Sequence, residues 1–236
     1  MQRILIAFLL LSAGSLPAAE APLAAARTIV LVRHGNYSAD PNADEKLGPK
    51  LSPLGVAQAH LAGARLRALP DRFDALYVSP MQRARDTAAL IGEDLPGQSF
   101  AVVDDLRECT PPTRRAKITA NEKPEDLAAC QAQLDRVFAR YFVPADGAAR
   151  TDLFVCHGNV IRSLITRALG VDSKAWLEMS LGHASITTIY IKADGSMQVI
   201  AAGDVGHIPP NLQSGTSADK DNPLRSRLAA SPAKAQ

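Results

Sequence analysis

The chain has 236 residues, of which 47% are hydrophobic and 5% aromatic. This is enough apolar surface to bury one sizeable core, so the composition predicts a single globular domain. The formal net charge is +2, and that excess falls in the segment from Asn211 onward, which leaves the preceding body close to neutral. A nucleic-acid binder usually carries a basic excess on its folded surface, so this class of protein is excluded.

The first residues are typical of a secretory signal peptide. A short basic start that contains Arg3 is followed by an apolar run from Ile4 to Leu16 and then by small residues suited to cleavage. We therefore predict a signal peptide over residues 1–21, with its end left open as far as residue 26, and export to a bacterial periplasm. The apolar run is shorter than the roughly 20 residues of a membrane span, so membrane contact is expected only if the leader stays uncleaved.

Strands and helices are predicted to alternate along the body of the chain. This rhythm is typical of an α/β domain, in which helices cover both faces of a mostly parallel sheet. We place this domain at residues 27–211 and predict that residues 212–236, with little to bury, form a disordered tail. The predicted strands lie within residues 28–33, 73–78, 100–108 and 152–158, the helices within 53–69, 80–91, 124–142 and 159–169, and a closing hairpin within 185–203.

Two of the predicted helices begin with capping signals. Ser52 is placed to cap a helix that Pro53 opens, and Ser79 with Pro80 repeats the arrangement. Apolar side chains at spacings of three and four then predict the buried face of each helix. These residues are Leu54, Ala57, Leu61, Ala64 and Ala68 in the first helix, and Ala84, Ala88 and Ile91 in the second.

The three cysteines allow at most one intramolecular pair. Cys156 lies in an apolar strand and is interpreted as a small core residue. We therefore predict a disulfide between Cys109 and Cys130, which the oxidising compartment expected for an exported protein permits. No CxxC spacing occurs, so a zinc ribbon is not predicted.

Two nearly identical stretches, LVRHGN at 31–36 and FVCHGN at 154–159, lie more than a hundred residues apart. Each leads an apolar strand into a tight turn, where glycine provides the backbone freedom. The segments that follow them differ, so the two stretches are not a tandem repeat. A histidine at such a strand end points into a crevice, and we expect the pair to have a chemical use.

Five polar residues are predicted to lie at strand ends or in first helical turns: Arg33, His34, Arg83, Glu108 and His157. Arginine binds phosphate through its planar fork, and a helix N-terminus adds N–H donors. Neighbouring arginines lower the pKa of a histidine, which would keep His34 neutral and nucleophilic towards phosphorus. His157 is expected to stabilise the transition-state charge, and Glu108 to protonate the departing oxygen and then activate water.

The motifs LVRHGNY, LSPLGVAQA, SPMQRARDTA, LRE and FVCHGNVIRSL, in this order, resemble those of the histidine phosphatase superfamily. Further on, WLEMSLGHASIT and GDVGHIPP resemble its mitochondrial members that act on phosphoserine and phosphothreonine. The resemblance covers residues 28 to about 212. It implies the three-layer phosphoglycerate mutase-like fold and a metal-independent phosphomonoesterase with no cofactor.

By the same resemblance, Arg33, Arg83 and His157 form the phosphate pocket, His34 becomes phosphohistidine and Glu108 is the proton donor. The extended insertion with which mutases enclose phosphoglycerate is not evident between the first two cysteines, which favours hydrolysis over transfer between carbons. The expected substrate is either a phosphoprotein or a small phosphoester, and the sequence predicts no oligomeric state.

Residues beyond the phosphate pocket are less defined by the motifs. Asn36, with Tyr37 after it, stands where many members have Glu-Thr or Ser-Gln, and it is a candidate for lining the substrate. His183 and His207 are expected in loops near the pocket mouth, either lining the substrate or lying on the surface.

The same residues are compatible with two other functions. His34, His157 and Glu108 are also the residue types of a two-histidine, one-carboxylate metal site, although Arg33 and Arg83 would repel a cation. Alternatively, the same residues belong to a binding module for a phosphorylated ligand that has lost turnover.

Overall fold

A six-stranded sheet in the order β4-β3-β6-β2-β7-β8 lies at the centre of the molecule. The structure, a computed structural model, describes residues 23–69 and 72–215. Strands β4, β3, β6 and β2 run parallel, whereas β7 and β8 form the predicted antiparallel hairpin at one edge. The strands are β2 (Arg27–Arg33), β3 (Ala75–Val78), β4 (Phe100–Val102), β6 (Arg150–Cys156), β7 (Ile186–Ile191) and β8 (Met197–Asp204).

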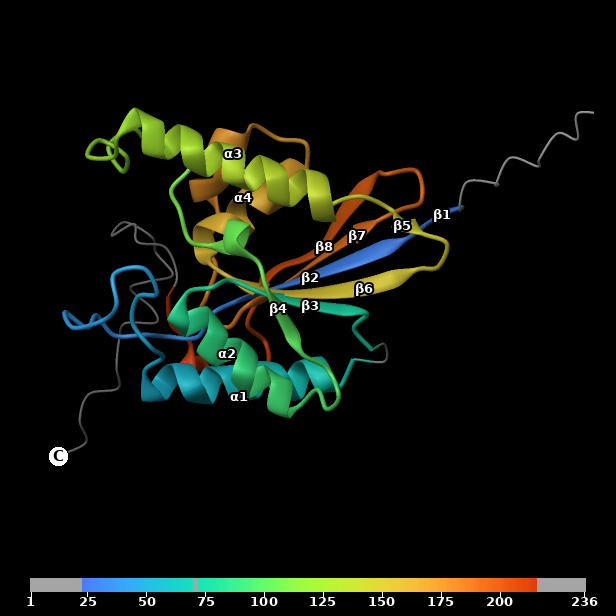
Figure 1. Ribbon diagram of the computed structural model, residues 1–236, viewed down its shortest axis with the longest axis horizontal. Helices are drawn as coiled ribbons and strands as arrows, with labels where there is room; N and C mark the ends of the chain where they lie inside the picture. Colours follow the sequence, from blue (N-terminus) through green and yellow to red (C-terminus); the bar gives the residue numbers. More distant parts are fainter. Residues whose placement is uncertain (1–22, 70–71, 216–236) are drawn as a thin grey trace, which may run out of the picture.

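Helices cover both faces of this sheet (Figure 1). In β2, Val30 and Val32 pack with one pair of helices, whereas Ile29 and Leu31 pack with the other, because successive side chains of a strand point to opposite faces. The predicted three-layer α/β fold is therefore confirmed. One pair is α1 (Pro53–Arg67) and α2 (Gln82–Glu93), and the other is α3 (Pro124–Tyr141) and α4 (Gly158–Ala168).

Short elements complete the chain. A two-stranded antiparallel sheet joins β1 (Ala24–Ala25) to β5 (Ala145–Asp146). The predicted signal peptide at 1–21 lies outside the described residues, as does the tail from residue 216. Short segments of 3-10 helix occur at η1 (Asp104–Leu106), η2 (Ser173–Glu178) and η3 (Pro210–Leu212).

The body of the domain continues past the predicted boundary at 211. Gln58 Nε2 donates to the carbonyl oxygen of Leu212 at 2.6 Å, and the backbone N–H of His183 donates to the carbonyl of Ser214 at 2.8 Å. Residues 212–215, assigned to the tail from composition, therefore contact the core of the domain.

The buried face of α1 differs from the predicted stripe. Ser52 caps the helix as predicted, accepting from the backbone N–H of Gly55. Ala64 and Ala68 are exposed, however, and the buried residues are Gly55, Gln58, Ala59, Ala62, Gly63 and Leu66. Small residues are needed here because a Cβ at Gly63 would lie 3.3 Å from the Cα of Ile91 in α2. Close packing between helices therefore determines this face, and apolar spacing does not reveal it.

Helix α2 also begins differently from the prediction. Its N-cap residue is Met81, which makes no side-chain capping hydrogen bond, and the helix starts at Gln82. The predicted face of Ala84, Ala88 and Ile91 is buried as expected. Ser79 is not the cap, because its side chain turns to a histidine of the candidate site.

Candidate active site

His34 follows β2 directly and is buried, with 1% of its surface exposed. Its Nδ1 lies 2.8 Å from the carbonyl oxygen of Gly35 and must carry a proton, since a carbonyl only accepts hydrogen bonds. Arg83 Nε donates to its Nε2 at 3.1 Å, which places the lone pair on Nε2. Burial, followed by His157 and Arg33, holds the pKa of His34 well below its usual value. His34 is therefore a neutral imidazole with a lone pair on Nε2.

His157 stands beside His34 because the two parallel strands that carry them are neighbours. The β2–β6 ladder pairs Arg33 with Cys156, so each histidine is the next residue after a paired position. The ring centroids of His34 and His157 are 5.1 Å apart. His157 is also the N-cap residue of α4, so the helix start faces this point. The two strand-end motifs thus bring both predicted histidines together.

Two arginines flank His34. Arg83 lies in the first turn of α2 and is 6% exposed. Arg33 Nη1 donates to the carbonyl oxygen of Leu181 at 2.6 Å and to that of Gly215. Burial, followed by the charge of Arg162, lowers the pKa of Arg33 to about 10, so this guanidinium keeps its charge at neutral pH. The buried Nε of Arg33 has no hydrogen-bond partner among the described residues, which leaves a donor for an anion.

The glycines of the motif allow the turn after β2 to approach α1 closely. A Cβ at Gly35 would lie 2.5 Å from the carbonyl oxygen of Gly55, and a Cβ at Gly55 would lie 2.0 Å from that of Asn36. Any side chain at either position would push the turn away from the helix. Both glycines are therefore required by the backbone that places His34.

Glu108 lies in the same electrostatic environment as the arginines. Burial raises the pKa of its carboxyl group, while the charges of Arg33, Arg83 and Arg162 oppose that shift. Its Oε1 is buried and has no hydrogen-bond partner among the described residues. A carboxyl group with a raised pKa keeps its proton to a higher pH than usual, which suits the proton-donor role expected for this residue.

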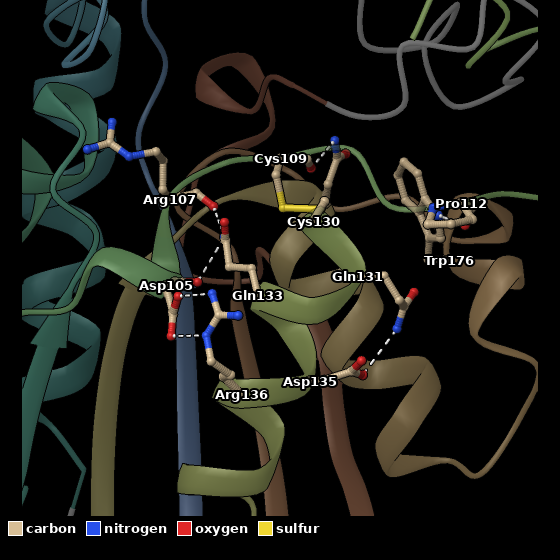
Figure 2. Close-up of a disulfide and its surroundings, with 11 residues drawn as sticks. Asp105, Arg107, Cys109, Pro112, Cys130, Gln131, Gln133, Asp135, Arg136 and Trp176 are labelled. Carbon is tan, nitrogen blue, oxygen red and sulfur yellow. Dashed lines mark hydrogen bonds and ion pairs between the residues drawn. A yellow bond between two sulfur atoms is a disulfide. The ribbon is translucent and has the colours of Figure 1, made fainter. Parts of the chain in front are cut away.

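The loop that carries Glu108 is tied to two helices. Cys109 forms a disulfide with Cys130 of α3 (Figure 2), which confirms the predicted pairing. Cys156 is free and buried. Gln133, also in α3, donates through Nε2 to the carbonyl oxygen of Arg107 at 2.8 Å. On the other side, Asn159 Nδ2 in α4 donates to the carbonyl oxygen of Cys109 at 3.2 Å. These contacts hold the backbone on both sides of Glu108.

His183 belongs to the site. Its ring centroid lies 5.5 Å from that of His34, and its Nε2 lies 3.2 Å from Arg33 Nη2, a donor. The other ring nitrogen, Nδ1, lies 3.0 Å from Ser214 Oγ. Burial, followed by the charges of Arg33 and Arg83, lowers the pKa of His183 to about 3. A neutral His183 therefore supports Arg33 from one side.

The side chain of Asn36 is held by hydrogen bonds to two serines. Its Oδ1 accepts from Ser52 Oγ at 2.7 Å, and its Nδ2 donates to Ser214 Oγ at 3.3 Å. Sequence reasoning missed Ser214 and Gly215, which join Asn36, His183 and Arg33 from the end of the domain. The sequence signal for this turn was the glycine after Ser214, because glycine readily adopts a positive φ. Gly215 has a φ of +72°.

His207 lies apart from the cluster of arginines and histidines. Its Nε2 lies 3.1 Å from the carbonyl oxygen of Ala184, and burial is the main cause of its lowered pKa. The charged groups that act on it are Asp204 and Arg65, not the arginines around His34. His207 thus contacts the backbone of the residue after His183 and not the arginines around His34.

Tyr37 is an aromatic residue that lies beside His34. Its ring centroid is 5.4 Å from that of His34, and the guanidinium of Arg83 lies 4.9 Å from the centre of its ring. Tyr37 is 37% exposed, whereas His34 and His157 are buried. Tyr37 therefore presents a partly exposed aromatic ring beside the buried His34.

The geometry does not favour the metal-site alternative. Within residues 23–69 and 72–215, no three His, Cys, Asp or Glu side chains gather in an arrangement that could hold a metal ion. His34, His157 and Glu108 therefore do not form the metal-ligand set considered from the sequence. Two cationic side chains, Arg33 and Arg83, act on His34, which suits an anionic group.

The family of this chain follows from comparison with known proteins. The model of the histidine phosphatase superfamily, branch 1, matches residues 29–113 and 111–202. The chain belongs to this superfamily. The matched segments contain all five residues singled out by the motifs: Arg33, Arg83 and His157, expected to form the phosphate pocket, together with His34 and Glu108.

Particular relatives extend this result. The mitochondrial serine/threonine-protein phosphatase PGAM5 of Mus musculus is 35% identical over 192 residues, which cover 79% of this chain and 66% of that protein. The corresponding protein of Caenorhabditis elegans is 36% identical over 197 residues, which cover 81% of this chain and 68% of that protein. The chain thus spans about two thirds of the length of these relatives. Both are mitochondrial by name, so periplasmic export is not supported by them.

Solved structures share the fold. A phosphoglycerate mutase from Plasmodium falciparum aligns with a TM-score of 0.54 at 24% identity, over 78% of this chain and 95% of that chain. The α-ribazole phosphatase from Shigella flexneri aligns with a TM-score of 0.60 at 18% identity, over 75% of this chain and 96% of that chain. The predicted phosphoglycerate mutase-like fold is confirmed. Among the described residues, no helix has the length and apolar character of a membrane span.

Proposed function

We propose that this protein is a phosphomonoesterase that works through a phosphohistidine on His34. The observation that carries the proposal is the state of the His34 ring, with its proton on Nδ1 held by a carbonyl and its lone pair on Nε2. The bond from Arg83 Nε to this lone pair is one that an incoming phosphoryl oxygen can replace, since arginine prefers an anion to a neutral nitrogen.

The first step transfers the phosphoryl group. The lone pair of His34 Nε2 attacks phosphorus, a nitrogen–phosphorus bond forms and the bond from phosphorus to the leaving oxygen breaks. Arg33, Arg83 and His157 bind the phosphoryl oxygens and stabilise their charge in the transition state. Glu108 gives its proton to the leaving oxygen, a role that its raised pKa supports.

The second step returns the enzyme to its first state. Glu108, now a carboxylate, takes a proton from a water molecule whose oxygen attacks the phosphorus of phosphohistidine. The nitrogen–phosphorus bond breaks, inorganic phosphate leaves and the lone pair returns to His34 Nε2. These two steps need no redox partner and no metal ion, because every proton and electron pair is accounted for by these residues and water.

The substrate is a phosphorylated protein or a small phosphoester. The names of the relatives describe serine/threonine-protein phosphatases, which favours phosphoserine and phosphothreonine as the first candidates for this chain. The near-neutral body offers no strong electrostatic attraction to a polyanion, so we expect selection by contacts near Tyr37. The leaving group extends along this ring from His34.

We also propose that the protein acts outside the cytoplasm. The signal-like leader supports export, and the Cys109–Cys130 disulfide fits an oxidising compartment such as the periplasm. Separating periplasmic from cytoplasmic protein of the source cell and immunoblotting for the chain tests this proposal. Recovery in the cytoplasm alone, with both thiols reduced, would contradict it.

The decisive experiment on the reaction compares wild-type protein with His34→Ala in a p-nitrophenyl phosphate assay that contains EDTA. We expect turnover by the wild type and a loss of at least about 10³-fold in the variant. His60→Ala is the matched control, because His60 is an exposed histidine on α1 and should keep full activity. An acid-labile phosphoryl label on the wild type, absent from His34→Ala, identifies the intermediate.

Each outcome of this experiment has a definite meaning. Turnover that survives in His34→Ala would exclude His34 as the nucleophile. Turnover that disappears with EDTA would contradict the metal-independent mechanism. Binding of phosphate without turnover of p-nitrophenyl phosphate, phosphoserine peptides or phosphothreonine peptides would identify the chain as the binding module considered above.

A further inference from the structure

Ser79 makes a contact that neither the motif nor the proposed roles explain. It follows β3 directly and is fully buried. Its Oγ lies 2.7 Å from Nε2 of His157, which is also fully buried. The backbone N–H of Met81 points to the same oxygen at 3.3 Å. Ser79, which was predicted to cap α2, is instead hydrogen-bonded to His157.

The hydrogen-bond inventory of Ser79 fixes the direction of this contact. A hydroxyl has one proton to donate, and Met81 N–H is itself a donor, so it cannot receive that proton. Among the described residues, His157 Nε2 is the remaining partner of Ser79 Oγ and therefore the acceptor. If Nε2 carried a proton instead, the buried hydroxyl hydrogen of Ser79 would have no acceptor, which costs free energy.

The state of His157 follows from this direction. A neutral imidazole has one protonated and one unprotonated nitrogen, so a hydrogen bond accepted at Nε2 places the proton on Nδ1. Nδ1 is buried and has no partner among the described residues. Burial, followed by the charges of Arg83 and Arg33, holds the pKa of His157 well below its usual value, so the ring is neutral. His157 therefore has an unused N–H donor close to the His34 ring.

We propose that Ser79 is a positioning residue that sets the tautomer of His157, so that Nδ1–H is available to donate to the phosphoryl oxygens. This inference rests on the proposed function and goes beyond it by assigning a role to a residue outside the reacting groups. With the opposite tautomer, the Nδ1 lone pair would face those oxygens and repel them. Ser79 thus determines which nitrogen of the neutral ring donates, without a change in the charge of the ring.

The kinetic test uses the single variants Ser79→Ala, Ser79→Thr and His157→Ala. It also uses the double variant in which Ser79 and His157 are both replaced by alanine. Losing an oriented donor to a developing oxyanion costs about 10²–10³-fold in kcat. Because Ser79→Ala leaves the ring in place but lets its tautomer vary, we expect a loss of about 10–100-fold in kcat, with little change in KM. Ser79→Thr keeps the hydroxyl and should recover most of the rate.

The double variant separates a role through His157 from a general effect on folding. If Ser79 acts through His157, adding Ser79→Ala to His157→Ala should change kcat by less than about two-fold, because the two losses are not additive. Additive losses would overturn the proposal, since they would mean that Ser79 acts independently of the ring.

A second measurement does not depend on turnover. Long-range ¹H–¹⁵N spectra of protein labelled at the histidine nitrogens report which nitrogen of each neutral ring carries the proton, and His157→Ala assigns the relevant signals. We expect the Nδ1–H tautomer for His157 in the wild type and a mixture of tautomers in Ser79→Ala. A wild-type His157 with its proton on Nε2 would refute the inference. This result is independent of phosphatase activity, so failure of the proposed function is distinguishable from failure of the Ser79 assignment.

Discussion

Removing the Cys109–Cys130 disulfide is expected to lower the free energy of unfolding by about 3 kcal/mol. The bond joins residues 21 positions apart in sequence, and the entropy of closing a loop of this length in the unfolded chain gives that value at 25 °C. For a domain of this size, such a loss corresponds to a fall in Tm of about 6–12 °C. The perturbation is the double substitution Cys109→Ala and Cys130→Ala.

Thermal unfolding followed by circular dichroism, with and without a thiol reductant, measures this effect. The reductant should lower the Tm of the wild type to about that of the double variant and should leave the Tm of the double variant unchanged. Cys109→Ala alone provides a further control, because it breaks the bond but keeps the buried Cys130 side chain. A fall in Tm of less than about 2 °C in both the reduced wild type and the double variant would refute the reasoning that the bond restricts the unfolded chain.

The other predictions concern the site. Glu108→Gln should lower kcat by about 10²–10⁴-fold for alkyl phosphates and by less for p-nitrophenyl phosphate, whose leaving group needs little protonation. Because the pKa of His34 is lowered, wild-type kcat should persist below pH 6.5. Because the pKa of Glu108 is raised, kcat should fall on the alkaline side as the carboxyl group loses its proton. A pH profile of Glu108→Gln should lack that alkaline fall. Arg83→Ala should weaken inhibition by inorganic phosphate and lower kcat by about 10²-fold, and unchanged inhibition would exclude it from the phosphate pocket. Tyr37→Leu should reduce the preference for aryl over alkyl phosphates about 5–10-fold in kcat/KM, and an unchanged ratio would mean that the leaving group does not contact this ring. Gly215→Ala should lower the free energy of unfolding by about 1–3 kcal/mol in a denaturant titration, since φ is +72° and the new Cβ would lie 2.1 Å from Nδ1 of His183.

The sequence predicted those parts of the site that depend on local pattern. Arg33 and His157 were located because apolar strands run directly into polar turns, and parallel strands bring such turns to one edge. The pairing of Cys109 with Cys130 followed from the apolar surroundings of the third cysteine. Strand–helix alternation was likewise enough to predict the three layers.

The parts that the sequence did not predict depend on contacts between distant segments. Ser79 had the spacing of a helix cap, but its hydroxyl is used by a histidine 78 positions away. Ser214 lies in a segment of low apolar content, yet its hydroxyl forms hydrogen bonds with Asn36 in the turn after β2 and with His183 in the loop before β7. The buried face of α1 depends on Gly55, which lets the turn after β2 approach, and on Gly63, which lets α2 approach, and glycine carries no apolar signal.

The strand register has a consequence for how this protein can change. His34 N–H donates to the carbonyl oxygen of Cys156 at 2.9 Å, so backbone hydrogen bonds between β2 and β6 continue to His34 itself. The separation of the two histidines is thus a property of the backbone, and the loops that contact a leaving group can vary in sequence without altering it. New substrate preferences should therefore be accessible through loop substitutions alone, whereas a one-residue slip of β2 against β6 would turn one histidine to the opposite face and abolish the chemistry for every substrate.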